Sequence, residues 1–199
     1  MSSFILEARV YFDHIVALAI PGRRVRSHQV VPPEMAAVGA LDDWQDDDLG
    51  LLIEECRRSL DSQQTRFDRL RTTAQVVLPI SIAVLVVFGS GLRRIVLEPT
   101  NAVRYGMYGA WALGSSLVLL SALGAAATLS IRSDFGSVQP TLLSQLHPPL
   151  KKQIAKAYAG QVMVGETTVG TRITVIRDSI TLLALGGVLQ VGLSIMNVF

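Results

Sequence analysis

The sequence predicts an all-α integral membrane protein with three transmembrane helices, two of which extend into cytoplasmic helical stalks, and an N-terminal amphipathic helix. Half of the 199 residues are hydrophobic and only 17% are charged, whereas soluble domains carry about a quarter charged residues. Three runs, 74–92, 105–131 and 179–199, contain no charged residue. Each is near or above the ~20 apolar residues that cross ~30 Å of hydrocarbon as a helix, and none alternates in polarity as a barrel strand does.

Residues 1–48 are predicted to form an amphipathic helix followed by an acidic, proline-containing linker. The segment 4–20 carries four ionisable groups, and such groups are costly at the centre of a bilayer. We therefore expect this helix to lie in the membrane interface or to pack on the protein, rather than to form a fourth span. A helix would place five apolar residues on one side: Phe4, Ala8, Tyr11, Ile15 and Leu18.

The linker begins with a basic turn and continues through two prolines. Arg23, Arg24 and Arg26 either meet anionic lipid headgroups or form a solvated turn. Pro32-Pro33 marks residues 30–40 as a linker.

The acidic run 42–48 predicts the N-terminus of a helix. Asp47 or Asp48 would cap the first free amides, and the other carboxylates would face the positive end of the helix dipole. A calcium-binding loop is the alternative. It fits less well, because its sixth position would be Asp48, where such loops need glycine.

Residues 49–199 are predicted to form the membrane domain, which begins with a helical stalk over residues 49–73. Steps of four and three residues place one stripe of mostly apolar residues along this helix, a pattern typical of helices that wind around one another. Gln63 is the one polar residue in the stripe, and Phe67 follows it. Gln63 would fix register, either with a second copy or within one chain. The stripe comprises Leu49, Ile53, Cys56, Leu60, Gln63, Phe67, Leu70, Ala74 and Val77.

The first two transmembrane helices are predicted at residues 74–92 and 105–131. Pro79 lies early in the first and should bend it. The connector 95–104 is short, so the second helix should return antiparallel. In the second helix Gly106, Ala110 and Gly114 recur every four residues, which lets another helix approach closely.

The cytoplasmic segment 132–178 is predicted to lead into the third transmembrane helix, 179–199. Residues 133–146 suggest a loop and a short helix. Pro148-Pro149 would then open a long helix. Its contact stripe is predicted at Ile154, Ala157, Gln161, Val164, Thr168, Thr171 and Val175.

The distribution of Lys and Arg predicts the orientation of the chain. Residues 1–73 hold nine of these residues, 93–104 hold three and 132–178 hold six. Three spans place the first and last groups on one side, and the positive-inside rule assigns that side, with the N-terminus, to the cytoplasm.

No pattern typical of catalysis or metal binding is found in the sequence. His14, His28 and His147 lack the spacing of a metal site, and residues 165–170 imitate the glycine spacing of a phosphate loop without its lysine. We therefore expect no enzymatic activity, no metal and no bound cofactor. The net charge of +2 gives no case for nucleic acid as a partner.

Polar residues inside the apolar runs are the remaining candidates for function. They bond neighbouring helices, or Gln190, Ser115 and Ser116 line a conduit in a homo-oligomer. The full set is Ser81, Ser115, Ser116, Ser121, Thr128, Gln190, Ser194 and Asn197.

In layout, residues 54–75 (EECRRSLDSQQTRFDRLRTTAQ) followed by residues 154–190 (IAKAYAGQVMVGETTVGTRITVIRDSITLLALGGVLQ) resemble the Pycsar transmembrane effectors and SLATT-type membrane domains of bacterial antiphage defence. The resemblance implies a homo-oligomer in the bacterial inner membrane. A cyclic nucleotide made on infection would bind its cytoplasmic stalks, and the oligomer would then disrupt the membrane. Four basic residues would meet the phosphate or else form a solvated face: Lys151, Lys152, Lys156 and Arg172.

Two other functions suit the same sequence. A structural or accessory subunit of a larger membrane complex would use the long stalks and the small-residue helix faces to hold partners. A holin-like pore former would suit the small size and the several spans, but it leaves the long stalks unexplained.

Overall fold

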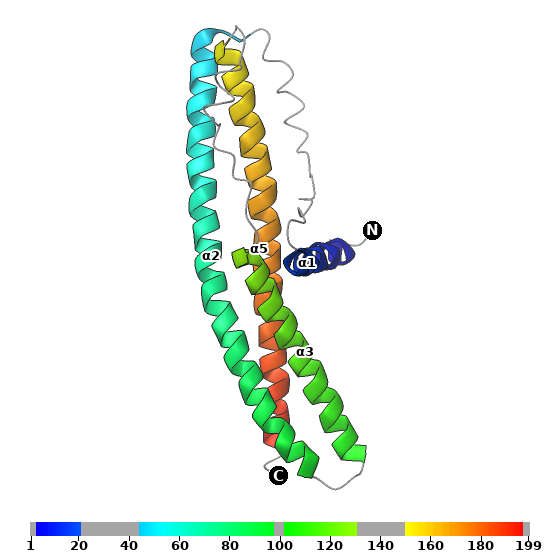
Figure 1. The fold of residues 1–199 in the computed structure, drawn as a ribbon. Helices are drawn as coiled ribbons and strands as arrows, with labels where there is room; N and C mark the ends of the chain where they lie inside the picture. Colours follow the sequence, from blue (N-terminus) through cyan, green and yellow to red (C-terminus); the bar gives the residue numbers. More distant parts are fainter. Residues whose placement is uncertain (1–2, 21–43, 98–101, 131–149, 197–199) are drawn as a thin grey trace. The chain divides into compact units, whose positions relative to one another are not determined.

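The computed structural model describes residues 3–20, 44–97, 102–130 and 150–196, and Figure 1 shows the four helices that these residues form. They are α1 (Ser3–Ala19), α2 (Asp46–Leu97), α3 (Ala102–Ser130) and α5 (Leu150–Met196). The predictions for Arg23, Arg24 and Arg26, for the linker 30–40, for the segment 133–146, and for His28, His147 and Asn197 lie outside the described residues.

Three of the described helices, α2, α3 and α5, are long enough and apolar enough to cross a membrane. This confirms the predicted all-α class and the predicted number of such helices. In the most apolar 18 residues of each, 22%, 44% and 17% of the residues are buried. The large apolar side chains of Val86 and Val188 are 69% and 70% exposed. Apolar surface left open on this scale marks contact with lipid or another helix.

α2 begins slightly earlier than the acidic run predicts. The carbonyl of Gln45 accepts the first helical hydrogen bond from the amide of Leu49, at 3.1 Å. Asp46, Asp47 and Asp48 therefore occupy the first turn. The prediction that Asp47 or Asp48 is the capping residue is wrong, although all three carboxylates do lie at the positive end of the helix dipole.

The chain divides into two compact units, which we describe separately. The bundle unit takes its residues from Met1–Val25, Leu70–Ile131 and Ile173–Phe199. The stalk unit takes its residues from Arg26–Arg69 and Arg132–Arg172. α2 and α5 each contribute to both units as one unbroken helix.

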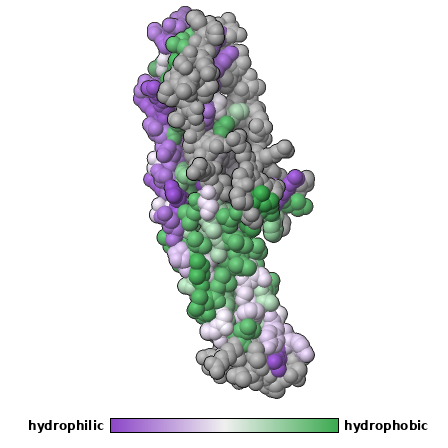
Figure 2. All heavy atoms as spheres, in the orientation of Figure 1, coloured by the Kyte–Doolittle hydropathy of each residue, from purple (hydrophilic) through white to green (hydrophobic). Residues whose placement is uncertain are grey.

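In the stalk unit, α2 packs against α5 through the stripe that the sequence predicts. Leu49, Cys56 and Gln63 are buried at intervals of seven residues, and Leu49 packs against Ala155. The rest of α2 in this unit presents a largely hydrophilic surface (Figure 2).

The predicted contact stripe of α5 is mostly displaced by a residue or two. Val164, which it contains, is 44% exposed, whereas Ala155, Ala159 and Val169 are buried. Of the predicted stripe, Val175 alone is buried. The other positions miss because the apolar residues of α5 are spread around the helix, so that their spacing does not single out one face. Small residues, not large ones, mark the side that meets α2.

In the bundle unit, small side chains from three helices form the centre. Ala74 and Val77 of α2 pack with Ala125 of α3 and Ile176 of α5. Because alanine carries only a methyl group, helix backbones can approach closely at such positions. α1 packs on α3 and runs across it (Figure 1). On the face shown in Figure 2, the middle of the unit is mostly hydrophobic.

Candidate functional site

The stalk unit contains a buried amide between its two helices. Gln63 is 4% exposed, and its Nε2 donates a hydrogen bond to the carbonyl of Val162 on α5, at 2.9 Å. Its Oε1 is buried and has no hydrogen-bond partner among the described residues. The side chain thus bonds within one chain, which is one of the two roles that the sequence left open for it.

Gly165 makes room for this amide. A Cβ atom at Gly165 would collide with Oε1 of Gln63. The pair fixes the register of α2 against α5, because a shift of either helix would bring a side chain of another size opposite Gln63. Residues 165–170, which imitate a phosphate loop, lie inside α5, and their first glycine serves packing.

Arg172 is the second buried polar group of the stalk unit. It is 3% exposed, and its Cζ lies 4.5 Å from the centre of the Phe67 ring. A guanidinium over an aromatic face is attracted by the ring quadrupole, most strongly where water is excluded. Arg172 and Phe67, which the sequence predicted as separate site residues, therefore contact each other.

The four predicted phosphate-binding residues do not form one cluster. Lys151 and Lys152 are half-buried and Lys156 is exposed. Lys151 Nζ lies 4.0 Å from a carboxylate oxygen of Asp46. Arg172 is 16 residues beyond Lys156 on the same helix, which is about 24 Å along the axis. A small anion could therefore not meet all four residues at once.

An exposed cation and a thiol lie side by side on α2. Arg57 Nε donates to the hydroxyl of Tyr158 at 3.2 Å, and this bond raises the pKa of Arg57. Cys56 is buried. Burial, helped by the charge of Glu55, raises the pKa of the Cys56 thiol, so the thiol stays protonated and unreactive at neutral pH.

We expect alkylation of Cys56 by iodoacetamide at neutral pH to be several-fold slower in the folded chain than in the denatured chain. The raised pKa means that the folded chain favours the neutral thiol. The stability that the folded chain gains from this preference is complete below the unfolded-state pKa of the thiol, and it is lost as the pH rises through the folded-state pKa. Mass spectrometry of the alkylated protein across a pH series measures the rate. Equal rates in the folded and denatured chains would contradict the buried position.

Two glycines of the bundle unit allow α2, α3 and α5 to touch. A Cβ atom at Gly114 would lie 3.0 Å from Phe88 of α2 and 3.6 Å from Leu189 of α5. One at Gly186 would lie 2.5 Å from Val118 and 3.1 Å from the carbonyl oxygen of Gly114. Gly114, a member of the predicted small-residue face, therefore makes close contact with both neighbouring helices.

Hydroxyl and indole groups add polar contacts between α2 and α3. Ser81 and Ser121, both fully buried, lie 3.2 Å apart, and Ser81 also donates to the carbonyl of Val77. Trp111 Nε1 donates to the carbonyl of Phe88 at 2.8 Å. These bonds match the interhelical role predicted for polar residues in the apolar runs.

The other residues predicted for helix packing or a conduit are spread over the bundle unit. Ser115 has a buried Oγ without a hydrogen-bond partner in the described part of the chain. Ser116 is exposed and donates to the carbonyl of Ala112. Gln190 is half-buried. Ala110 packs beside the cluster of Met107 and Leu193, while Gly106 has no described atom near its missing Cβ.

The sequence did not reveal how α1 attaches to the bundle. The Tyr11 hydroxyl donates to the carbonyl of Leu120 at 2.6 Å and lies 3.3 Å from Ser179 Oγ. Gly124 faces both hydroxyls and leaves no room for a Cβ. Periodicity could place Tyr11 on one side of its helix, but it could not name the residues opposite.

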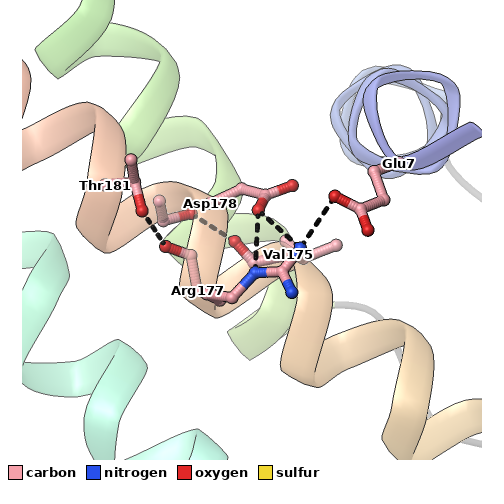
Figure 3. Close-up of polar contacts among 6 residues, drawn as sticks. Glu7, Val175, Arg177, Asp178 and Thr181 are labelled. Atoms are coloured by element: carbon pink, nitrogen blue, oxygen red, sulfur yellow. Dashed lines mark hydrogen bonds and ion pairs between the residues drawn. The ribbon is translucent and has the colours of Figure 1, made fainter. Parts of the chain in front are cut away.

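An ion-pair group lies beside this contact. Arg177 Nη2 lies 2.9 Å from a carboxylate oxygen of Glu7 and 3.3 Å from one of Asp178. Figure 3 shows Glu7 reaching from α1 toward the guanidinium, with Thr181 bonded to the Arg177 carbonyl one turn further along α5. The charge of Glu7 on α1 is thus paired next to the start of the third apolar run.

Comparison of the chain with protein-family models, with curated proteins and with solved structures finds no match. In the described ranges, no three His, Cys, Asp or Glu side chains are grouped so that they could hold a metal ion. The fold alone defines the class. The chain is an all-helical protein whose three long apolar helices are compatible with a multi-pass membrane protein.

Proposed function

We propose that this protein is a signal-gated membrane effector of antiviral defence. As a homo-oligomer in the bacterial inner membrane, it would bind a cyclic nucleotide on its cytoplasmic stalks and then disrupt the membrane. One observation carries the proposal: α2 and α5 each continue from a charged segment into an apolar segment without a break. A displacement of either stalk helix would therefore move the segment that contacts lipid.

The stalk supplies cations for such a signal. Lys151 and Lys152 lie in the first turn of α5, where free amides and the helix dipole also favour an anion, and Lys156 lies in the second turn. A phosphate would compete with Asp46 for Lys151. Arg172 is buried against Phe67, so it would reach a phosphate only after the stalk helices separate. The ligand must bind the open arrangement more tightly than the closed one, or nothing shifts.

The orientation that we propose for the chain in the membrane follows from the distribution of Lys and Arg. Residues on the N-terminal side of the first span and in the segment before the third carry most of the Lys and Arg. We therefore place the N-terminus and both stalk segments in the cytoplasm, which is where a cyclic nucleotide would be made.

Membrane potential measured in bacterial cells tests this function. We expect a potential-sensitive dye to report depolarisation only when a nucleotide cyclase is expressed with the protein. Combined replacement of Lys151, Lys152 and Lys156 by alanine should abolish the response. Replacement of Arg66 and Arg71, two exposed residues of α2, should leave it intact. Depolarisation without any cyclase would contradict the proposal and favour a holin.

A surface groove favours the second function, an accessory subunit. Trp44, Leu51 and Leu52 line a shallow groove of about 540 Å³ together with Asp48 and Glu55. Trp44 and Leu51 are 45% and 68% exposed, and exposed aromatic and apolar side chains are typical of protein contacts. A partner that purifies with the chain at fixed stoichiometry, with no depolarisation under any trigger, would support this function instead.

A further inference from the structure

α1 presents apolar residues on two opposite sides. Tyr11, His14 and Ala17 are buried on the side that packs against the bundle. Four large apolar side chains remain open on the other side, three of them on α1 and the fourth at Ile20, which follows the last residue of the helix. Their spacings of seven, four and four residues align them in one stripe, in which Arg9 is also exposed. The stripe comprises Ile5 (53% exposed), Phe12 (53%), Val16 (38%) and Ile20 (47%).

The buried side is held at a defined point of α3. The Tyr11 hydroxyl donates to the carbonyl of Leu120 and reaches Ser179 of α5. Gly124 permits this approach, because a Cβ there would overlap both hydroxyls. The position of α1 is therefore fixed to one turn of α3.

The length of the apolar run in α3 indicates how deep in a bilayer the turn that contacts α1 would lie. Residues 105–131 would extend about 40 Å as a helix, roughly 10 Å more than the hydrocarbon of a bilayer. Counted from Tyr105, however, Gly124 is about 30 Å along the helix. Beyond Gly124, Ala125 packs against α2 and α5 in the centre of the bundle. The turn of α3 that contacts α1 thus lies about one hydrocarbon thickness from Tyr105, near the start of α3.

On α5, charged residues lie next to the residue that α1 contacts. Ser179, which Tyr11 contacts, is the first residue of the third charge-free run. Arg177 and Asp178 come immediately before it, and Arg177 pairs both with Asp178 and with Glu7 of α1. Paired charges beside an apolar surface are expected where hydrocarbon gives way to headgroups. Figure 2 shows hydrophobic residues of α1 beside the hydrophobic surface of the bundle unit.

We propose that α1 is a membrane-interface helix whose stripe of Ile5, Phe12, Val16 and Ile20 contacts the lipid acyl chains just below the headgroups. The occupant is lipid, because the stripe continues the apolar surface of the bundle at the level where the hydrocarbon ends. A helix that lies in the interface buries its apolar side about 5–10 Å into the acyl boundary. This placement does not depend on the proposed function.

Spin labelling of the full chain in phosphatidylcholine–phosphatidylglycerol vesicles tests the proposal. In a Cys56→Ala background, single labels replace Ile5, Phe12 or Val16. References replace Val86 in the first apolar run and Leu51 in the stalk, which are 69% and 68% exposed. Accessibility to oxygen and to a water-soluble nickel chelate should place the α1 labels between the two references. Values equal to those of Leu51, or as lipid-like as those of Val86, would overturn the proposal.

A second pair of variants tests the attachment at Gly124. Gly124→Val should displace Tyr11 and increase the mobility of the label at Phe12. Gly109→Val, on the same helix with no described atom near its missing Cβ, should not. Helix content by circular dichroism checks that both variants fold. An immobile Phe12 label in a folded Gly124→Val protein would overturn the assigned contact.

Discussion

Replacing Gly186 by valine is expected to lower the unfolding free energy of the detergent-solubilised protein by about 1–3 kcal/mol, the usual cost of overpacking a close contact. The new side chain would meet Val118 and the carbonyl oxygen of Gly114. Neither can give way easily, because a valine on a helix has one strongly preferred rotamer and the carbonyl belongs to the backbone. Thermal unfolding followed by circular dichroism measures the loss.

The next residue supplies a matched control. Gly187 lies in the same apolar run, and no described atom lies within 4 Å of its missing Cβ. Gly187→Val makes the same change in helix propensity without the collision, so it should be neutral or slightly stabilising. Equal unfolding temperatures for the two variants would contradict the close contact between α5 and α3 at Gly186.

Replacing Gln63 by glutamate is expected to destabilise the stalk strongly at neutral pH. The substitution puts a carboxylate oxygen where Nε2 now donates to the carbonyl of Val162, so two acceptors face each other in a buried site. Breaking a buried polar contact and leaving a charge unpaired costs about 3–5 kcal/mol. Chemical unfolding in detergent, followed by the helical signal, measures the change.

This loss should depend on pH, and the adjacent glutamine provides the control. Burial raises the pKa of an introduced glutamate, and the protonated acid can donate to Val162. Stability should therefore be highest below the unfolded-state pKa, about 4.3, and fall as the pH rises through the folded-state value. Gln64 is exposed, so Gln64→Glu should show neither effect. A Gln63→Glu protein as stable as Gln64→Glu at neutral pH would contradict the buried amide.

The sequence predicts the helices well because their determinants are local. Charge-free runs of about 20 residues mark membrane-crossing segments whatever surrounds them. The stripe of α2 is also reliable, because leucine, cysteine and glutamine at intervals of seven contrast with charged residues between them. Both predictions need only the chemistry of one helix.

The sequence predicts the contacts between helices less well. On α5 the side that meets α2 is marked by Ala155, Ala159 and Gly165, and small residues are also common on exposed sides. The attachment of α1 depends on Gly124 and Ser179, more than a hundred residues away in the chain. The four predicted anion-binding residues share one helix, but spacing alone did not reveal that Arg172 is buried.

The fit between Gln63 and Gly165 constrains both positions together. The glycine admits the long amide, and the amide fills the space that the glycine leaves. A methyl group at position 165 would therefore be accepted only with a shorter residue at position 63. Homologous chains that keep this stalk should exchange the two residues in concert, so that bulk lost on one helix is regained on the other.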